Sequence, residues 1–130
     1  MTEIDLGKYR YLVVDDDEFS RDVLASALSH MGATQVHCAA DGAQAIRLAS
    51  QLRPDFILLD IYMPEIDGWA VLDQLRQLLP GVVAVMVTGS VLPGDFTKSM
   101  DQRVEGYCIK PAMQDVLRKT LISAWQRRHA

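Results

Sequence analysis

The sequence is poor in the features that mark several large classes of protein. It has only two cysteines in 130 residues, and no paired cysteine or histidine stands at the spacing of zinc ligands. No apolar run approaches the ~20 residues that a membrane-spanning helix needs. The acidic N-terminus lacks the basic-then-apolar pattern of a signal peptide. We therefore expect a cytoplasmic protein in which Cys38 and Cys108 are reduced core residues.

An excess of positive charge and a phosphate-binding loop are missing as well. The chain has 17 acidic and 13 basic residues, for a formal net charge of −4, whereas nucleic-acid-binding domains concentrate positive charge on one face. No glycine-rich segment has the spacing of a nucleotide-binding loop. We expect no contact with nucleic acid or membrane. With 49% hydrophobic and 23% charged residues, the composition is that of one ordinary globular domain.

Short apolar runs alternate with segments of helical period along the chain. The segments predicted as strands are residues 11–14, 35–39, 56–59, 82–87 and 107–109. The segments with helical spacing are residues 19–31, 41–52, 68–79 and 112–125, with Phe19 and Val116 predicted to face the core. Residues 90–106 give the weakest pattern, and a short helix is expected after Asp95. Strict alternation predicts an α/β fold of five β–α units around a doubly wound parallel sheet.

Polar side chains stand where the predicted strands end. Asp15 and Asp16 follow the first strand, and Asp60 follows the third, which is a run of four apolar residues. Thr88 and Lys110 follow the fourth and fifth strands. Parallel strands bring their C-terminal ends to one edge of the sheet, which is where open α/β sheets bind ligands. The sequence therefore predicts that carboxylates, one hydroxyl and one amine meet at this edge.

This combination of groups is typical of phosphoryl transfer. Clustered carboxylates repel one another unless a positive charge neutralises them. Mg²⁺ does so through carboxylate, water and phosphate oxygens. Lys110 supplies a compact positive charge for a phosphoryl group, and Thr88 supplies a hydroxyl that donates to a phosphoryl oxygen. Asp60 is the best candidate for a carboxylate nucleophile that forms an aspartyl-phosphate, because it lies on the predicted central strand between the acid pair and Lys110.

With these residues the chain resembles the receiver domain of two-component response regulators. The matching segments are Val13-Val14-Asp15-Asp16, Leu59-Asp60-Ile61-Tyr62-Met63-Pro64, Ile66-Asp67-Gly68, Val87-Thr88-Gly89 and Tyr107-Cys108-Ile109-Lys110-Pro111. They occur in the order and spacing of the family and cover almost the whole chain. The resemblance implies a flavodoxin-like (βα)5 fold with a five-stranded parallel sheet of order 2-1-3-4-5. It also implies a single receiver domain over residues 1–130, with a core at about residues 9–128.

The resemblance further implies how the site works. Asp60 would accept a phosphoryl group from a histidine of a sensor kinase or of a histidine phosphotransfer protein. Asp16, Asp60 and the backbone carbonyl of Tyr62 would hold Mg²⁺, and Asp15 would complete the acidic pocket through water. Lys110 would bind the phosphoryl group. The protein would be no enzyme beyond its own phosphorylation and dephosphorylation.

A conformational switch is the other implied property. Thr88 would move toward the phosphoryl group, and Tyr107 would swing inward with it. This motion would remodel the face formed by the fourth helix, the fifth strand and the fifth helix, where a downstream protein would bind. The peptide bond between Lys110 and Pro111 is expected to be cis. The turn-like segment Val91-Leu92-Pro93-Gly94 departs from the family pattern, so we expect the fourth helix to begin late.

Several residues have simpler interpretations. Asp17 and Glu18 are expected at the start of the first helix, and Asp67 is expected to be a turn or capping residue. Tyr62 is interpreted equally well as partial packing or as a shield for the phosphoryl group. The basic end of the last helix is expected to be a solvated helix terminus.

Two other functions are considered for this sequence, together with the question of an output domain. A receiver-like interaction module that is never phosphorylated would not need the complete acid, Thr and Lys set. A small phosphatase of the haloacid-dehalogenase kind would use the Asp-x-Asp spacing of Asp15 and Asp17, but the later acidic motif and the cap domain of that class are missing. We expect no output domain after the fifth helix; a complete regulator and a piece of a longer protein both fit.

Overall fold

The computed structural model describes residues 4–63 and 66–129. Five parallel strands form one sheet in the order β2-β1-β3-β6-β7. Their bounds are β1 Arg10–Val14, β2 Gln35–Ala39, β3 Phe56–Leu59, β6 Val83–Thr88 and β7 Gly106–Ile109. This is the predicted 2-1-3-4-5 order, because β4 and β5 form a separate antiparallel pair. That pair, β4 Tyr62–Met63 and β5 Ile66–Asp67, was not predicted from the sequence.

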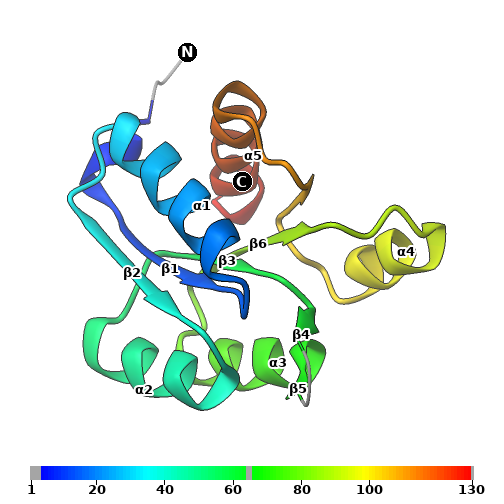
Figure 1. Cartoon of the computed structure of the whole chain (residues 1–130). Coiled ribbons are helices and arrows are strands. Elements are labelled where there is room, and N and C mark those ends of the chain that lie inside the picture. Colours follow the sequence, from blue (N-terminus) through cyan, green and yellow to red (C-terminus); the bar gives the residue numbers. More distant parts are fainter. Residues whose placement is uncertain (1–3, 64–65, 130) are drawn as a thin grey trace.

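Helices cover both faces of the sheet. Their bounds are η1 Leu6–Lys8, α1 Glu18–His30, α2 Gly42–Leu52, α3 Gly68–Leu78, α4 Pro93–Asp101 and α5 Gln114–Arg128. Figure 1 shows α1 and α5 on one side of the sheet and α2 and α3 on the other. This is the flavodoxin-like arrangement expected from strict βα alternation. In the same view α4, drawn in yellow, stands away from the other helices.

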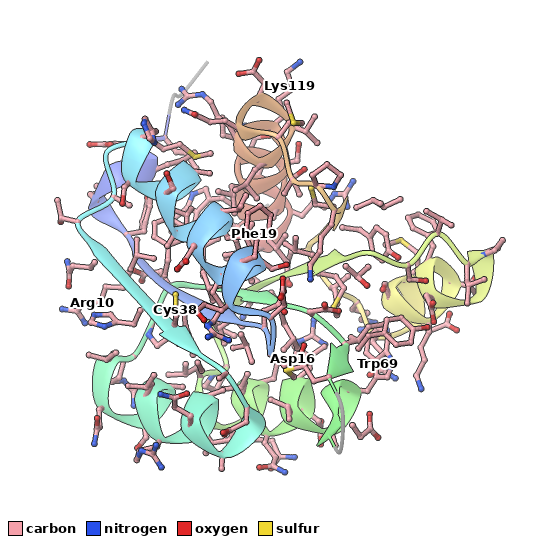
Figure 2. The ribbon with its side chains drawn as sticks, viewed as in Figure 1. Arg10, Asp16, Phe19, Cys38, Trp69 and Lys119 are labelled. Atoms are coloured by element: carbon pink, nitrogen blue, oxygen red, sulfur yellow. The ribbon has the colours of Figure 1, made fainter. Side chains whose placement is uncertain are left out.

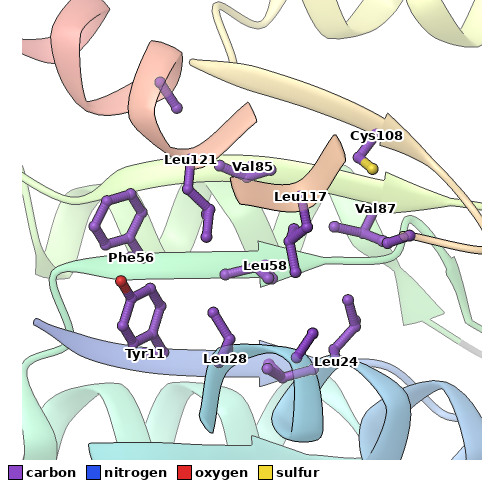
Figure 3. Packing of buried hydrophobic residues seen from close by; sticks show 14 of the residues in the cluster. Tyr11, Leu24, Leu28, Phe56, Leu58, Val85, Val87, Cys108, Leu117 and Leu121 are labelled. Atoms are coloured by element: carbon purple, nitrogen blue, oxygen red, sulfur yellow. The ribbon is translucent and has the colours of Figure 1, made fainter. Parts of the chain in front are cut away.

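Two hydrophobic clusters, one on each face of the sheet, form the core. The cluster under α1 and α5 includes Tyr11, Leu28, Leu58 and Leu117, all of them at most 1% exposed (Figure 3). The other cluster lies under α2 and α3. All four residues of β3 are buried, as a central parallel strand requires, because it has helices on both faces. Among the described residues, no member of either cluster comes from α4.

The helices differ in how they begin. Asp17, Asp41 and Asp67 are the N-caps of α1, α2 and α3, and each carboxylate accepts a backbone N–H two or three residues further on. Asp17 and Glu18 lie at the start of α1 as expected, and the interpretation of Asp67 as a turn or capping residue is confirmed. By contrast, α4 and α5 follow Leu92 and Met113, and neither has a side-chain cap.

Three details of the sequence-based expectations are wrong. The fourth helix begins at Pro93 and not after Asp95, because proline suits the first helical position, where no N–H partner is needed. Phe19 and Val116 are 74% and 52% exposed instead of facing the core. Both lie in the first turn of their helices, and Phe19 lines a cavity with Lys110 at the edge of the sheet instead of packing on a strand. The last helix begins at Gln114, close to the predicted start near Ala112.

Two further expectations concern the state of the cysteines and the absence of a membrane-spanning helix. Cys38 and Cys108 are both free thiols, but only Cys108 is fully buried. Cys38 lies on the edge strand β2 and is half-buried (Figure 2), since no strand covers its outer side. Within residues 4–63 and 66–129, none of the helices combines the length and the hydropathy that a membrane crossing would require.

Candidate functional site

The acidic residues are positioned by hydrogen bonds that continue the sheet past its strands. The N–H of Asp15 donates to the carbonyl of Ala39 at 3.1 Å, and the N–H of Asp60 donates to the carbonyl of Val14 at 3.0 Å. In the same way the N–H of Lys110 donates to the backbone carbonyl of Thr88 at 2.8 Å. Adjacent parallel strands therefore place these residues side by side at the C-terminal edge, as predicted from the sequence.

Three carboxylates converge at this edge. One oxygen from each of Asp15, Asp16 and Asp60 lies within 4.8 Å of the others. Asp15 and Asp60 are 1% and 6% exposed, whereas Asp16 is open to solvent (Figure 2). Backbone donors orient the two buried groups: Asp15 Oδ1 accepts the N–H of Asp17 at 2.9 Å, and Asp60 Oδ1 accepts the N–H of Tyr62 at 2.9 Å. Their remaining oxygens are left for other partners.

Lys110 provides the positive charge that faces these oxygens. Its Nζ lies 2.8 Å from Asp60 Oδ2, to which it donates a hydrogen bond, and 2.6 Å from Asp15 Oδ2. The contact with Asp15 is an ion pair, so Lys110 bridges the two buried carboxylates. The bond between Lys110 and Pro111 is cis, as expected.

Burial and ion pairing pull the pKa values of this group in different directions. Burial raises the pKa of Asp15 above its usual value, and the neighbouring Lys110 offsets only part of that effect. Burial would lower the pKa of Lys110, but its two carboxylate partners together raise that pKa above the usual value. Lys110 is therefore a firmly charged ammonium, and Asp15 is a carboxylate held at a cost in free energy.

The residues present suit a hard divalent cation. Three carboxylates face one amine, so the cluster keeps an excess of negative charge. Asp15 and Asp60 share the single ammonium of Lys110, and carboxylate oxygens are the ligands that Mg²⁺ prefers. Asp17 does not belong to the cluster, since its side chain caps α1 by accepting from Ser20. The Asp-x-Asp arrangement considered for a phosphatase is therefore not assembled.

Thr88 and Tyr107 each form a hydrogen bond with the backbone of Ser90. Thr88 is fully buried, and its Oγ1 accepts the N–H of Ser90 at 3.2 Å. Tyr107 is half-buried, and its hydroxyl donates to the carbonyl of Ser90 at 3.5 Å. Its ring packs edge-to-face on Phe96 of α4, with the centroids 5.3 Å apart. The two predicted switch residues are thus joined by the loop that leads into α4.

Asp95 was not predicted from the sequence to contribute to this edge. Its Oδ2 accepts hydrogen bonds from both the Tyr62 hydroxyl and the Ser90 hydroxyl. Tyr62 and Ser90 border an open cavity of about 420 Å³, whose other lining residues are Asp60, Gly89, Val91, Leu92 and Lys110. No periodic pattern in the sequence marks these contacts, because they join single polar side chains from β4, from the loop after β6 and from α4.

Comparison with known proteins identifies the family. Residues 11–122 match the model of the response regulator receiver domain. The chain belongs to this family. It is a receiver domain of two-component signalling, and the predicted fold and family resemblance are confirmed.

The similarity extends to proteins of different architecture. This receiver domain is 34% identical over 110 residues to the sensor histidine kinase RcsC of Salmonella typhimurium, covering 85% of the chain and 12% of that protein. It is 35% identical over 109 residues to the response regulator MprA of Mycobacterium ulcerans, covering 83% and 47%. A CheY-like receiver domain structure from Methanospirillum hungatei superimposes with a TM-score of 0.82 at 25% identity, covering 93% of this chain and 96% of that one. The chain thus spans less than half the length of these two curated relatives.

Proposed function

We propose that Asp60 accepts a phosphoryl group from a phosphohistidine of a sensor kinase or of a histidine phosphotransfer protein. An oxygen of the Asp60 carboxylate forms a bond to phosphorus, the histidine N–P bond breaks, and its electron pair stays on the imidazole nitrogen, which takes up a proton. The observation that carries this proposal is the placement of Asp60, a buried carboxylate that borders an open cavity and faces Lys110.

The neighbouring residues suit the remaining roles. Asp15, Asp16 and Asp60, with the backbone carbonyl of Tyr62, would hold Mg²⁺, which neutralises charge on the transferred group when it is bound. Lys110 now pairs with Asp60 Oδ2, and it is placed to follow the new phosphoryl oxygens. Thr88 would donate its hydroxyl to one of them. The domain thereby catalyses only its own phosphorylation and dephosphorylation.

The output would pass through the face formed by α4, β7 and α5. A groove of about 310 Å³ runs between these elements, with Phe96, Met100 and Tyr107 on one side and Lys119 and Arg127 on the other. Phe96 and Met100 are 49% and 41% exposed, so apolar surface is available to a downstream protein. Tyr107 connects this groove to Ser90 and hence to the acidic edge. We propose that phosphorylation changes the shape of this groove.

Formation of a covalent adduct tests the acceptor. The protein is incubated with Mg²⁺ and a small phosphodonor, and intact mass is measured before and after mild alkaline treatment. We expect one Mg²⁺-dependent, base-labile phosphoryl adduct that is absent in Asp60→Asn. Asp101→Asn, which changes an exposed carboxylate on α4, is the matched control and should keep the adduct. An adduct that persists in Asp60→Asn would place the acceptor elsewhere.

A further inference from the structure

Helix α4 has little packing to hold it in place. Ser99 is its only buried residue, and its hydroxyl donates to the carbonyl of Asp95 within the same helix. Phe96 and Met100 are largely exposed, and no side chain caps the first turn. Since most of the stability of a helix in a protein comes from packing of its apolar face, α4 depends on a few individual contacts.

Those contacts lie at both ends and in the middle of the helix. At the C-terminal end, the guanidinium of Arg76 donates to the backbone carbonyls of Gln102 and Arg103. In the middle, Phe96 packs on Tyr107, and the Lys98 ammonium lies 5.3 Å from the centre of the Trp69 ring. Figure 2 shows Trp69 on the side of the molecule that faces α4. The N-terminal end is held by Asp95.

Asp95 receives two hydrogen bonds on a single oxygen. The hydroxyls of Tyr62 and Ser90 both donate to its Oδ2. We call these three residues the α4 clasp. Its chemistry is consistent with a charged acceptor: the hydrogen bonds from Ser90 and Tyr62 lower the pKa of Asp95, and Asp95 raises the pKa of Tyr62. Asp95 also lies in the first turn of α4, where the helix dipole favours a carboxylate.

The two donors of the clasp sit on the two loops that flank the acceptor carboxylate. The N–H of Tyr62 donates to Asp60 Oδ1, so this loop is bonded directly to the acceptor. The N–H of Ser90 donates to Thr88 Oγ1, so the other loop is bonded to the predicted switch hydroxyl. The cavity that reaches Asp60 is bordered by both Tyr62 and Ser90. A group attached to Asp60 within this cavity therefore lies between the two donors.

We propose that the α4 clasp couples the state of Asp60 to the position of α4. In the unmodified protein, Asp95 ties the first turn of α4 to Tyr62 and Ser90, which line the cavity. A phosphoryl-sized group on Asp60, or withdrawal of Thr88 Oγ1 toward it, displaces Tyr62 and Ser90. Both bonds to Asp95 weaken together, and α4 is released at its N-terminal end while Arg76 keeps the other end in place. Only the trigger of this release rests on the proposed function, and Asp95 acts as a positioning residue.

Hydrogen exchange followed by mass spectrometry tests whether the clasp holds α4. In the unmodified full chain, we expect the amides of α4 to exchange about tenfold faster in Asp95→Asn than in the wild type, because both hydrogen bonds to a charged acceptor are weakened. Tyr62→Phe removes one donor and should give a smaller acceleration. Asp101→Asn on the same helix is the matched control and should change nothing. Exchange in Asp95→Asn within twofold of the wild type would overturn the proposal.

Beryllofluoride with Mg²⁺ tests the coupling. In the wild type we expect slower exchange around Asp60 and Tyr62 on adding the two reagents, and faster exchange in α4. In Asp95→Asn the first change should persist and the second should vanish. Slower exchange around Asp60 with no change in α4 of the wild type would overturn the coupling and leave the proposed function standing. If no part of the site responded, the proposed function would fail, and the ligand-free comparison of Asp95→Asn would still decide whether the clasp exists.

Discussion

The two halves of the C-terminal edge are built in different ways. On one side, Asp15, Asp60 and Lys110 are tied to the sheet by backbone hydrogen bonds and to each other by ion pairs. On the other side, α4 contributes nothing to the hydrophobic clusters of the described chain and is held at its first turn by Asp95. Figure 1 shows the same contrast, with α4 standing apart from the layered body of the domain.

The difference separates chemistry from signalling. Phosphoryl transfer needs groups fixed within fractions of an ångström, and a buried sheet edge supplies that precision. A switch instead needs an element with two arrangements of similar free energy, and a helix held by a few polar contacts meets that need. The clasp stands between the halves, because Tyr62 bonds to Asp60 on one side and to Asp95 on the other.

The largest expected effect comes from truncating the same residue type in the two regions. Leu58 is fully buried in the central strand, so Leu58→Ala should lower the free energy of unfolding by about 3 kcal/mol. Leu92 is 61% exposed at the start of α4, so Leu92→Ala should lower the free energy of unfolding by no more than about 0.5 kcal/mol. Urea unfolding of both variants measures the difference. Similar losses would mean that α4 is packed as firmly as the sheet.

Removing the buried charge of Asp15 should stabilise the folded domain. Asp15→Asn eliminates a carboxylate whose burial is unfavourable, so we expect the free energy of unfolding at pH 7 without Mg²⁺ to rise by about 1.5 kcal/mol. Asp101→Asn, an exposed change on α4, should give no gain. Adding Mg²⁺ should stabilise the wild type more than Asp15→Asn, because the variant lacks one negative charge of the acidic cluster proposed to hold the ion. A loss of stability in Asp15→Asn would show that the ion pair with Lys110 outweighs burial.

The gain from Asp15→Asn should depend on pH in a defined direction. The pKa of Asp15 is raised in the folded protein above the usual 3.8, so the folded state binds this proton more tightly than the unfolded state. The charged form therefore costs stability at neutral pH. That cost fades as pH falls below the raised pKa and is gone below 3.8, where Asp15 is protonated in both states. The advantage of Asp15→Asn should shrink over the same interval.

The helix caps give a smaller effect with the same contrast. Asp41→Ala removes the carboxylate that accepts the N–H of Gln44 at 2.8 Å, and it should cost about 1 kcal/mol of stability. Leu92→Ser would give α4 the side-chain cap that it lacks, and we expect slower hydrogen exchange in its first turn with little change in global unfolding. An equal effect of both changes on global unfolding would contradict the separation of α4 from the body.

The fold and the acidic cluster could be predicted because their signals are local and repeated. Apolar runs mark the buried parallel strands, and the polar residue after each run falls at one edge by topology alone. The cap at Asp67 could be predicted as well, because a cap depends on neighbours within three residues. A helical stripe, however, states which side of a helix is apolar and not how far the helix extends past the sheet. Phe19 was therefore assigned to the core, although it lies at the edge.

The clasp could not be predicted for a related reason. Tyr62 and Asp95 are 33 positions apart, and their contact depends on how β4 and the first turn of α4 are placed relative to each other. Neither residue belongs to a helical stripe of apolar residues or to an apolar strand segment. The departure at Val91-Leu92-Pro93-Gly94 was visible in the sequence, but the partners of the neighbouring Ser90 were not. Surface hydrogen bonds between loops carry no repeating signal, so the region that links the site to its output was also the region least accessible to sequence reasoning.

The smallest expected effect, and the most specific to the clasp, is a shift in the pKa of Tyr62 when Asp95 is replaced. Its hydrogen bond to Asp95 raises its pKa above the usual 10.0, so the bond holds at lower pH and is lost as pH rises through the raised value. Asp95 has a lowered pKa, so its contribution is lost only as pH falls through a value below 3.8. Tyrosinate absorbance of the wild type minus that of Tyr62→Phe isolates this residue from the other tyrosines. We expect the Asp95→Asn background to shift the difference titration to lower pH. An unchanged midpoint would mean that Tyr62 and Asp95 are not bonded in solution, and α4 would then rest on Arg76 and the ring contacts alone.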